Sequence, residues 1–445
     1  MARVVVVGGG FGGMASAARL AKLGHRVTII ERLPQLGGAV GFLERDGYRW
    51  DTGPAWTLLP AVLRDLFSKS GRPLERELDL LPVRRQHRFA DDTVLDLPTG
   101  SRAAVIDAVD DALGAGHGRR WADFVHSFAE PWDVLRRNYF EVPFRPDHLS
   151  TEALALLRSR LTLQKTTAHA LRDERLRRLA LLPAVLGGHD PRNVPAWLGL
   201  ISYLEHTFGR WTIRGGFGRL GHALANRLTE RQVTVMTGVT ARDVQIDAGR
   251  AVGVDTDHGQ IEAELVVCAV DPRRLASLAP LVEDTMPALP PAVTHLGLAG
   301  QVPDLGGGPG LPGEVVVHAA GTKRLGAATM VVRSSGSGRA GTAAWTVLSR
   351  GTLAEDPLTA LARTGLDVRG KVETRVDVSV REQVQAWAGS PYGTLWQGRR
   401  TLGNRLRTTT PVTGVYAAGA SVAGATGLPF VGLSAAVVAQ VIGRA

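Results

Sequence analysis

The first 31 residues of the 445-residue chain alternate short apolar runs with glycine turns. Residues 4–7 are four consecutive valines, a pattern typical of a parallel strand buried on both faces. After a glycine-rich turn, residues 14–23 have helical character, with frequent Ala and Leu and no helix breaker before Gly24. A second apolar run at residues 27–30 ends in Glu31. This order of strand, turn, helix and strand predicts a parallel βαβ unit at the start of the chain.

The turn of this unit carries the spacing G-x-G-x-x-G at Gly8, Gly10 and Gly13. Glycines at this spacing permit a tight turn, a close approach of the backbone to a pyrophosphate, and close packing of helix on strand. The helix that follows offers free N–H groups and a positive dipole end to phosphates. Glu31 is placed to accept hydrogen bonds from a ribose diol, so the unit as a whole predicts a dinucleotide site. Its predicted cofactor contacts are Gly8, Gly10, Phe11, Gly12, Gly13, Glu31 and Arg32.

Further along, the apolar pattern changes twice. From about residue 61 to 204 it is mostly helical, and from about 277 to 404 short β-like runs alternate with Gly- and Pro-rich loops. One helix face is expected to carry four aromatic residues at spacings of three or four, namely Trp121, Phe124, Phe128 and Trp132. A packed core is favoured for this face over the wall of an apolar substrate channel, and both interpretations stay open.

Composition narrows the possible functions. The length exceeds the size at which one hydrophobic core stops growing, so at least two domains are expected. The single cysteine, Cys268, excludes an intrachain disulfide and a multi-cysteine metal site, and no metal ligand cluster is found in the sequence. The net charge of +10 comes mostly from arginine in short clusters such as residues 84–88, which we interpret as solvated faces. No nucleic-acid-binding motif accompanies that charge.

The segment after Glu31 resembles a known family. Gly37 and Gly38 follow the acid by about six residues, a hairpin is expected at residues 42–50, and Asp51-Thr-Gly53-Pro54 comes next. These features are similar to the flavin-binding opening of the carotenoid (phytoene) desaturases, which lie within the flavin amine oxidase superfamily. The resemblance implies that Gly37, Gly38, Gly53 and Pro54 approach FAD. One departure is Ala39, where the family usually has arginine.

Two later segments extend the resemblance. Residues 209–220, with Gly215-Gly216, are followed by a predicted helix, a strand at 233–236 and a hairpin, as in the second cofactor segment of the family. From its spacing, Ala241 is chosen for the adenine contact. The end of the chain resembles the third flavin motif, in which a strand, a glycine-rich loop and a helix N-terminus meet the flavin ring. The residues implied there are Gly419, Ala420, Gly427, Phe430, Val431 and Gly432.

The resemblance implies an α/β fold with a Rossmann-like FAD-binding domain, discontinuous in sequence, and a mixed α+β substrate-binding domain. We expect residues 1–95, 205–276 and 405–445 in the FAD-binding domain, and residues 96–204 and 277–404 in the substrate domain. No second dinucleotide fingerprint is present, which argues against a reductase with its own nicotinamide fold.

The implied reaction is hydride transfer from a substrate C–C or C–H bond to flavin N5, with FAD carrying the chemistry. No protein residue is assigned a catalytic role. Positional candidates for the substrate pocket are Trp56, Thr57, Tyr203, Glu205, Tyr392 and Trp396. The first hypothesis is a dehydrogenase or desaturase of an apolar polyene, terpenoid or polyketide-like substrate, in a carotenoid or other specialised pathway. A flavin amine oxidase and a non-catalytic binding protein on the same fold remain as alternatives. Ala420 speaks against the amine oxidase, since those enzymes usually carry an acid there.

No stretch of about 18 apolar residues predicts a transmembrane helix. We therefore expect a cytoplasmic protein, with peripheral contact at an anionic membrane surface left open because basic residues favour it. The sequence leaves open the individual substrate, the number of bonds oxidised, the electron acceptor and the oligomeric state.

Overall fold

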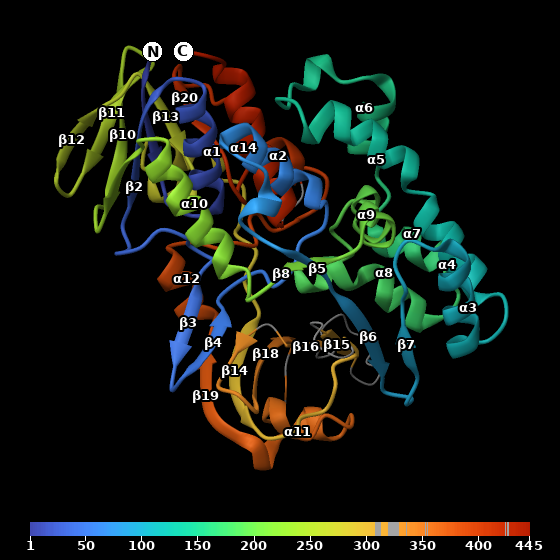
Figure 1. Ribbon diagram of the computed structural model, residues 1–445. Helices are drawn as coiled ribbons and strands as arrows, with labels where there is room; N and C mark the ends of the chain where they lie inside the picture. The colour runs from blue at the N-terminus through green and yellow to red at the C-terminus, as the bar shows by residue number, and fades with distance from the viewer. Residues whose placement is uncertain are drawn as a thin grey trace.

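The computed structural model describes residues 1–307, 313–318, 329–334, 336–351, 353, 355–422, 424 and 427–445. Three parts meet in it: a parallel sheet with its helices, a block of helices, and a larger, mainly antiparallel sheet at the bottom of Figure 1. The space between these three parts is where the candidate site lies.

The first sheet has five parallel strands in the order β20-β13-β1-β2-β9. They are β1 (Arg3–Val7), β2 (Arg26–Glu31), β9 (Thr234–Thr237), β13 (Leu265–Cys268) and β20 (Val415–Ala417). Because side chains alternate along a strand, Val4 and Val6 pack toward the helices, while Val5 and Val7 pack into a separate cluster on the opposite face. The buried parallel strands and the Rossmann-like class expected from the sequence are confirmed.

Helices cover one face of this sheet. They are α1 (Phe11–Lys22), α2 (Pro60–Ser70), α10 (Gly218–Glu230) and α14 (Leu428–Ile442), and α1 packs against the other three. The opposite face is covered by an antiparallel meander of β10 (Ala241–Asp247), β11 (Arg250–Thr256) and β12 (Gly259–Glu262). Cys268 ends β13 in that core, where burial raises the pKa of its thiol to about 12.

The second sheet has seven strands in the order β19-β14-β18-β16-β15-β6-β7. They are β6 (Arg84–Phe89), β7 (Val94–Asp96), β14 (Ala292–Ala299), β15 (Gly313–His318), β16 (Thr329–Arg333), β18 (Thr342–Arg350) and β19 (Val372–Val378). All neighbours are antiparallel except β6 and β15. The helix α11 (Pro357–Ala362) packs on the outer face, and the inner face turns toward the rest of the molecule (Figure 1).

Small sheets connect the large ones. The expected hairpin is present as β3 (Phe42–Arg45) and β4 (Tyr48–Asp51), and β4 also pairs with β17 (Gly336–Ser337). A two-stranded sheet joins β5 (Leu80–Pro82) to β8 (Trp211–Ile213). The mostly helical pattern expected from about residue 61 to 204 is thus interrupted at residues 80–96, where strands pair with distant segments. The domain boundaries stay a prediction, and β6 and β7 run in the second sheet.

The helical block lies on the right of Figure 1. It contains α3 (Arg102–Leu113), α4 (His117–His126), α5 (Ala129–Leu135), a π-helical turn (Arg136–Phe140), α6 (Thr151–Arg158), α7 (Leu163–Ala170), α8 (Glu174–Leu186) and α9 (Leu200–Phe208). Two further helices, α12 (Val380–Trp387) and α13 (Thr401–Asn404), precede the last strand. Short 3-10 turns cover Leu74–Arg76, Pro146–His148, Ala196–Gly199, Pro272–Arg274, Ala279–Val282 and Arg369–Lys371.

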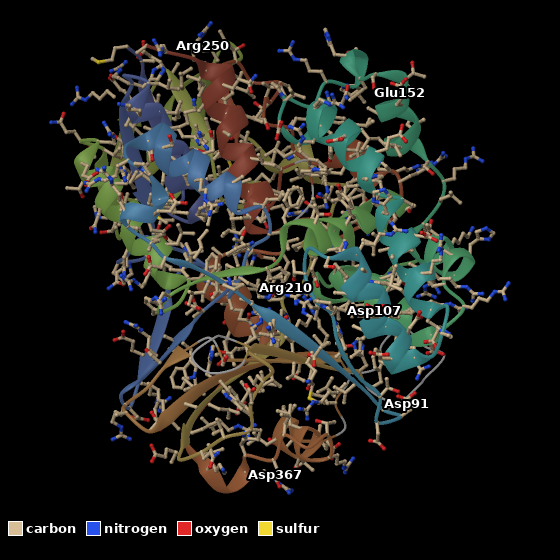
Figure 2. All side chains as sticks on the ribbon, turned by 45° about the vertical axis from the view of Figure 1, so that its right-hand side comes forward. Asp91, Asp107, Glu152, Arg210, Arg250 and Asp367 are labelled. Atoms are coloured by element: carbon tan, nitrogen blue, oxygen red, sulfur yellow. The ribbon has the colours of Figure 1, made fainter. Side chains whose placement is uncertain are left out.

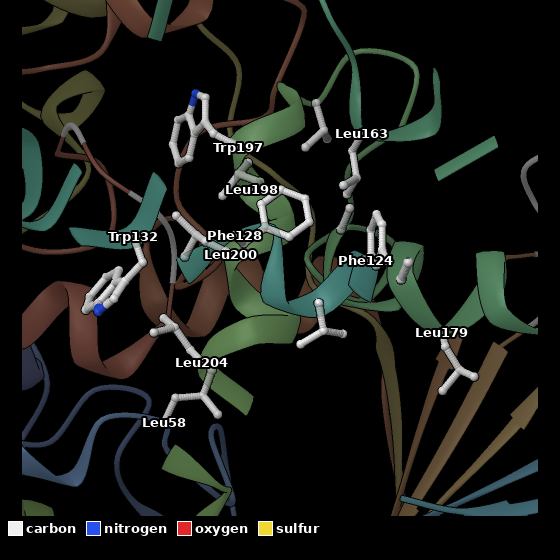
Figure 3. Close-up of a cluster of buried hydrophobic side chains, with 14 of the residues drawn as sticks. Leu58, Phe124, Phe128, Trp132, Leu163, Leu179, Trp197, Leu198, Leu200 and Leu204 are labelled. Atoms are coloured by element: carbon white, nitrogen blue, oxygen red, sulfur yellow. The ribbon is translucent and has the colours of Figure 1, made fainter. Parts of the chain in front are cut away.

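The aromatic residues expected on one helix face lie on two helices. Trp121 and Phe124 belong to α4, Phe128 caps the start of α5, and Trp132 lies within α5. All four are at least 94% buried in one apolar cluster, which Figure 3 shows around Phe128 and Leu200. None of them lines the main cavity described below, so the core interpretation is the one the structure supports.

No helix among the described residues is both long enough and apolar enough to cross a bilayer.

Candidate active site

A cavity of about 410 Å³ lies where the carboxyl ends of the parallel strands meet the second sheet and the helical block. Its lining includes the residues that directly follow or end β1, β2, β13 and β20. Parallel α/β sheets bind ligands at this edge, because the strand ends and the helix N-termini point the same way there. Three chemically different walls make up the cavity.

The first wall is the turn between β1 and α1. A Cβ on Gly13 would lie 1.9 Å from the carbonyl oxygen of Gly8, so only glycine allows α1 to pack this closely on β1. Gly10 differs, because it lines the cavity and a Cβ there would meet no atom within 4 Å. No side chain caps α1 at Gly10, and its first turn holds no acid. The turn is therefore a cradle open on its cavity side, which fits the phosphates of a dinucleotide.

Glu31 lies beside this turn and is 8% exposed. Its Oε2 accepts a hydrogen bond of 2.7 Å from the backbone N–H of Gly9, and its Oε1 accepts one of 2.8 Å from Leu33. These two bonds fix the carboxylate at the cavity and leave each oxygen a free acceptor site for a ribose hydroxyl. Arg32 also lines the cavity and donates to the carbonyls of Gln385 and Ala386, near the end of α12.

The start of α14 closes the same end of the cavity. Gly427 precedes the helix without a side-chain cap, and the first turn holds no acid. A Cβ on Gly12 would lie 3.0 Å from the Cα of Gly419, so the turn before α1 and the turn after β20 are in close contact. Two positive helix ends thus face one cavity, which favours electron-rich groups of a ligand. Residues 423, 425 and 426 of the glycine-rich loop lie outside the described residues.

Most of the sequence-predicted residues meet at this cavity. The lining includes Gly8, Gly10, Phe11, Gly12, Glu31, Arg32, Gly38, Gly53, Pro54, Gly419, Ala420, Gly427, Phe430 and Val431, and also the substrate candidates Trp56, Thr57, Glu205, Tyr392 and Trp396. Their individual roles stay predictions. Five predicted residues do not line it, namely Gly13, Gly37, Tyr203, Ala241 and Gly432.

Gly13, Gly37 and Gly432 pack against or bond segments next to the cavity, whereas Tyr203 and Ala241 lie elsewhere. Gly37 donates its N–H to the carbonyl of Gly9 at 2.9 Å, and Gly432 packs on Val62, as Gly13 packs on Gly8. Tyr203 packs against the apolar cluster of the helical block. Ala241 begins β10 outside the cavity, two residues after Val239, whose N–H donates to the carbonyl of Glu31 at the end of β2.

Asp51 is a cavity residue that sequence reasoning used only as part of a motif. It ends β4, is 3% exposed, and its Oδ1 accepts a 2.9 Å hydrogen bond from the N–H of Gly218. No described residue bonds its Oδ2. Burial raises the pKa of Asp51 to about 6, against the opposing effects of the Gly218 and Phe217 N–H groups and of Arg333. A carboxyl that titrates near neutral pH therefore lines the cavity.

The second wall is charged, and sequence reasoning named only two of its residues, Trp56 and Glu205, without their charged partners. Arg85, which we expected on a solvated face, is 3% exposed and lines the cavity, so that interpretation is wrong for this residue. Its Nε donates to Glu314 at 2.6 Å and its Nη1 donates to both oxygens of Glu205 at 3.1 Å. Arg333 donates to Glu314 at 2.8 Å, and Trp56 Nε1 donates to the same carboxylate at 3.0 Å.

Arg210 completes this network by donating to Glu205, and it lies in the middle of the molecule in Figure 2. Burial opposes the ionisation of Glu314, but Arg85, Arg333 and Arg210 outweigh it and lower the pKa of Glu314 to about 2. Both carboxylates of the network are thus held as partners of guanidinium groups. The only sequence signal for this wall was alternation in β6, where Arg85, His87 and Phe89 are buried and Arg84 is exposed.

The third wall is apolar. It is formed by helices of the block, by two strands of the second sheet, by the segment before α13 and by the first turn of α14. Its residues are Leu163, Pro183, Ala184, Leu186, Leu198, Ile201, Val293, Leu348, Tyr392, Trp396 and Phe430. Trp396 is 2% exposed and packs edge-on against Trp197, with ring centroids 5.7 Å apart. A mostly apolar, largely preformed cavity with a few polar groups is typical of a small-molecule site.

Comparisons with known proteins agree with this geometry. The model of the family described as flavin containing amine oxidoreductase matches residues 11–442. The chain is 31% identical to a phytoene dehydrogenase of Streptomyces griseus over 274 residues, which is 60% of this chain and 54% of that protein. It is 34% identical to a hydroxyneurosporene desaturase of Cereibacter sphaeroides over 284 residues, which is 61% of this chain and 57% of that protein. The match thus spans a little over half the length of these relatives.

Among solved structures, a double mutant of putrescine oxidase superposes with a TM-score of 0.69. That superposition covers 99% of this chain and 98% of the other, at 15% sequence identity. At that identity the likeness establishes the fold, and a cradle for a dinucleotide beside an apolar pocket is what the described residues supply.

Proposed function

The chain belongs to the family of flavin-containing amine oxidoreductases, and on that basis we propose that it is an FAD-dependent dehydrogenase of an apolar polyene, terpenoid or polyketide-like substrate. The observation that carries the proposal is that one cavity of about 410 Å³ combines a glycine-rich end, which fits FAD, with opposite walls that are largely apolar. When bound, FAD supplies a hydride acceptor at its N5. The desaturase names of the relatives support a carbon–carbon bond as the site of oxidation.

The residues of the chain contribute binding, orientation and exclusion of water. Gly10 and the N-terminus of α1 would hold the pyrophosphate, Glu31 the ribose, and residues 419–421 and 427–431 the flavin ring. Leu198, Ile201 and Leu348 would hold the substrate chain by burial of apolar surface, at about 25 cal/mol per Å². Asp51 would hold or release a proton at Oδ2, since its pKa of about 6 lies near neutral pH.

Two features disfavour the alternative of an amine oxidase. A protonated amine would meet the guanidinium groups of Arg85 and Arg333 in the lining. Tyr392 and Trp396 are the two aromatic candidates that could surround an amine, but both rings already face cations. Arg350 Cζ lies 5.2 Å from the ring of Tyr392, and Arg405 Cζ lies 4.3 Å from that of Trp396. The intact cradle at Gly10 likewise favours an enzyme over a non-catalytic binding protein.

The absorption spectrum of the purified protein tests the proposal. We expect flavin bands, directly or after addition of FAD, and anaerobic bleaching by an apolar polyene, tested both as a hydrocarbon and as a carboxylic acid, but not by putrescine. Absence of flavin binding, or bleaching by the amine instead, would contradict the proposal. The variant Ile201→Asp places a charge on the apolar wall and should slow bleaching at least about tenfold while flavin stays bound. Leu161→Asp, at a 56% exposed leucine, is the matched control and should change nothing.

We further propose a cytoplasmic location with peripheral contact at an anionic membrane, from which an apolar substrate could enter. Met286 and Leu289 are each 54% exposed, and their loop leads to the cavity residue Pro291. The net charge of +10 favours anionic lipid. Sedimentation with phosphatidylglycerol vesicles, reversed by salt and absent with phosphatidylcholine, is expected, and equal recovery with both lipids or with neither would contradict the proposal.

A further inference from the structure

The inner face of the seven-stranded sheet carries a row of polar residues. Arg85, Glu314, Arg333, Thr346 and His295 are paired in register across five neighbouring strands, from β6 to β14. We call these five residues the polar row. Three of them, Arg85, Arg333 and Thr346, line the cavity.

The rest of the sheet shows how unusual this row is. Two positions further along the strands, on the same face, the paired residues are His87, Val316, Val331, Leu348 and Val293. The last four of these pack against Leu182 of α8 in an apolar cluster. The outer face is apolar as well, with Leu296, Val315, Val332 and Val347 in the core under α11. Charged groups are therefore concentrated in one row beside the cavity.

The charges of the row do not cancel, because Arg85 and Arg333 share one carboxylate, Glu314. Arg210 and Glu205, which join the network from outside the row, add one charge of each sign and leave one positive charge in excess. His295 adds none, because burial lowers its pKa to about 4. Asp51 lies near Arg333 but also near Arg49, so counting the carboxyl of Asp51 together with the guanidinium of Arg49 does not remove the positive excess. An excess cation in a buried network is costly unless something pairs with it.

Guanidinium N–H groups in the row also lack acceptors. Arg85 is 3% exposed, and no described residue accepts a hydrogen bond from its Nη2. Arg333 bonds Glu314 only through Nε, and no described residue accepts from its two terminal nitrogens, although its side chain is only 12% exposed. A pure hydrocarbon would cover these donors without satisfying any of them.

We propose that the polar row binds a carboxylate at one end of the substrate. The substrate is then an apolar molecule, acyclic or cyclic, that ends in a carboxylic acid, and it is not a pure hydrocarbon. This proposal rests on the proposed function and specifies its substrate class. The guanidinium of Arg333 offers parallel N–H donors that match a carboxylate, and Arg85 behind it supplies further positive charge. The apolar wall then holds the chain, and FAD is reached along it within the same cavity.

A matched pair of ligands tests the carboxylate directly. trans-Parinaric acid is a fluorescent conjugated tetraene, and its methyl ester keeps the same chain but carries a methyl group in place of the charge. We expect the flavin-loaded protein to bind the acid about 10- to 100-fold more tightly than the ester, the range that charge-assisted hydrogen bonds supply. Equal affinities for acid and ester would overturn the proposal.

Variants then assign the effect to the row. Arg333→Met should reduce the affinity for the acid to that for the ester and leave the ester unchanged, and Arg333→Lys should retain part of the preference. The control is Arg375→Met on β19, which removes the same charge from a residue that pairs with Asp356 and Asp377 and does not line the cavity. If Arg333→Met weakened acid and ester equally, the row would be a structural network only, and the proposal would be wrong.

The outcome is separable from that of the proposed function. Flavin content and bleaching by a polyene decide whether the protein is an FAD-dependent dehydrogenase. The difference between acid and ester is a binding measurement, so it stands or falls even if neither ligand is oxidised.

Discussion

The two ends of the cavity recognise ligands by different means. The nucleotide end is built from backbone, where glycines and helix N-termini do most of the work and Glu31 is the main side chain. The opposite end is built from side chains of five paired strands, among them Arg85 from early in the chain and Glu314 from 229 residues later. Backbone recognition depends on local spacing, whereas the polar row depends on strand register. The first can therefore be read from a short sequence motif, and the second cannot.

The largest expected effect comes from breaking the polar row. Glu314→Gln removes the carboxylate shared by Arg85 and Arg333 and should lower the free energy of unfolding by about 3–5 kcal/mol, because two buried cations lose their partner. Chemical denaturation measures this loss. The control, Glu262→Gln, acts on a surface pair with Arg3 in which Glu262 is 71% exposed, and should cost at most about 1 kcal/mol. Equal losses in the two variants would mean that the row is not a buried network.

The difference between the two ends explains what sequence reasoning could reach. The βαβ unit with Gly10 and Glu31 and the hairpin at β3 and β4 follow from motifs whose residues lie close together in sequence. Gly419 lies near the other end of the chain, and its place at the same cavity was expected from the family resemblance. Arg85 was misplaced because its cluster looks like a surface run, and only the pairing of β6 with β15 shows which of its arginines turn inward. Ala241 does not line the cavity, and its adenine contact stays a prediction, because spacing alone does not reveal where the chain leaves the cavity.

A second effect concerns the carboxyl between the two ends. Because burial raises the pKa of Asp51 to about 6 from its ordinary value of 3.8, the folded protein binds this proton more tightly than the unfolded chain. Asp51 therefore does not lower the free energy of unfolding below about pH 4. Its destabilising effect grows as the pH rises from about 4 to about 6 and then levels off, at no more than about 3 kcal/mol. Asp51→Asn should thus stabilise the protein at pH 7 but not at pH 4. A stabilisation that is the same at both pH values, as measured by urea unfolding, would contradict the assigned pKa.

A third comparison lies within the nucleotide end. Gly13→Ala places a Cβ 1.9 Å from the Gly8 oxygen and should cost about 1–3 kcal/mol of stability together with the bound flavin. Gly10→Ala has room in the protein itself, so its fold should be unchanged while the affinity for FAD falls by about tenfold or more. Thermal unfolding without FAD and flavin titration separate the two. If Gly10→Ala bound FAD normally, the cradle assigned here would not be the phosphate site.

The most direct test of the central claim is a crystal structure of the protein with FAD bound. We expect the pyrophosphate at Gly10 and the N-terminus of α1, the adenosine ribose at Glu31, and the flavin ring against residues 419–421 and 427–431, with the apolar wall and the polar row left for the substrate. FAD bound outside this cavity, or with its ring directed away from Trp56 and from these residues, would contradict the proposed site.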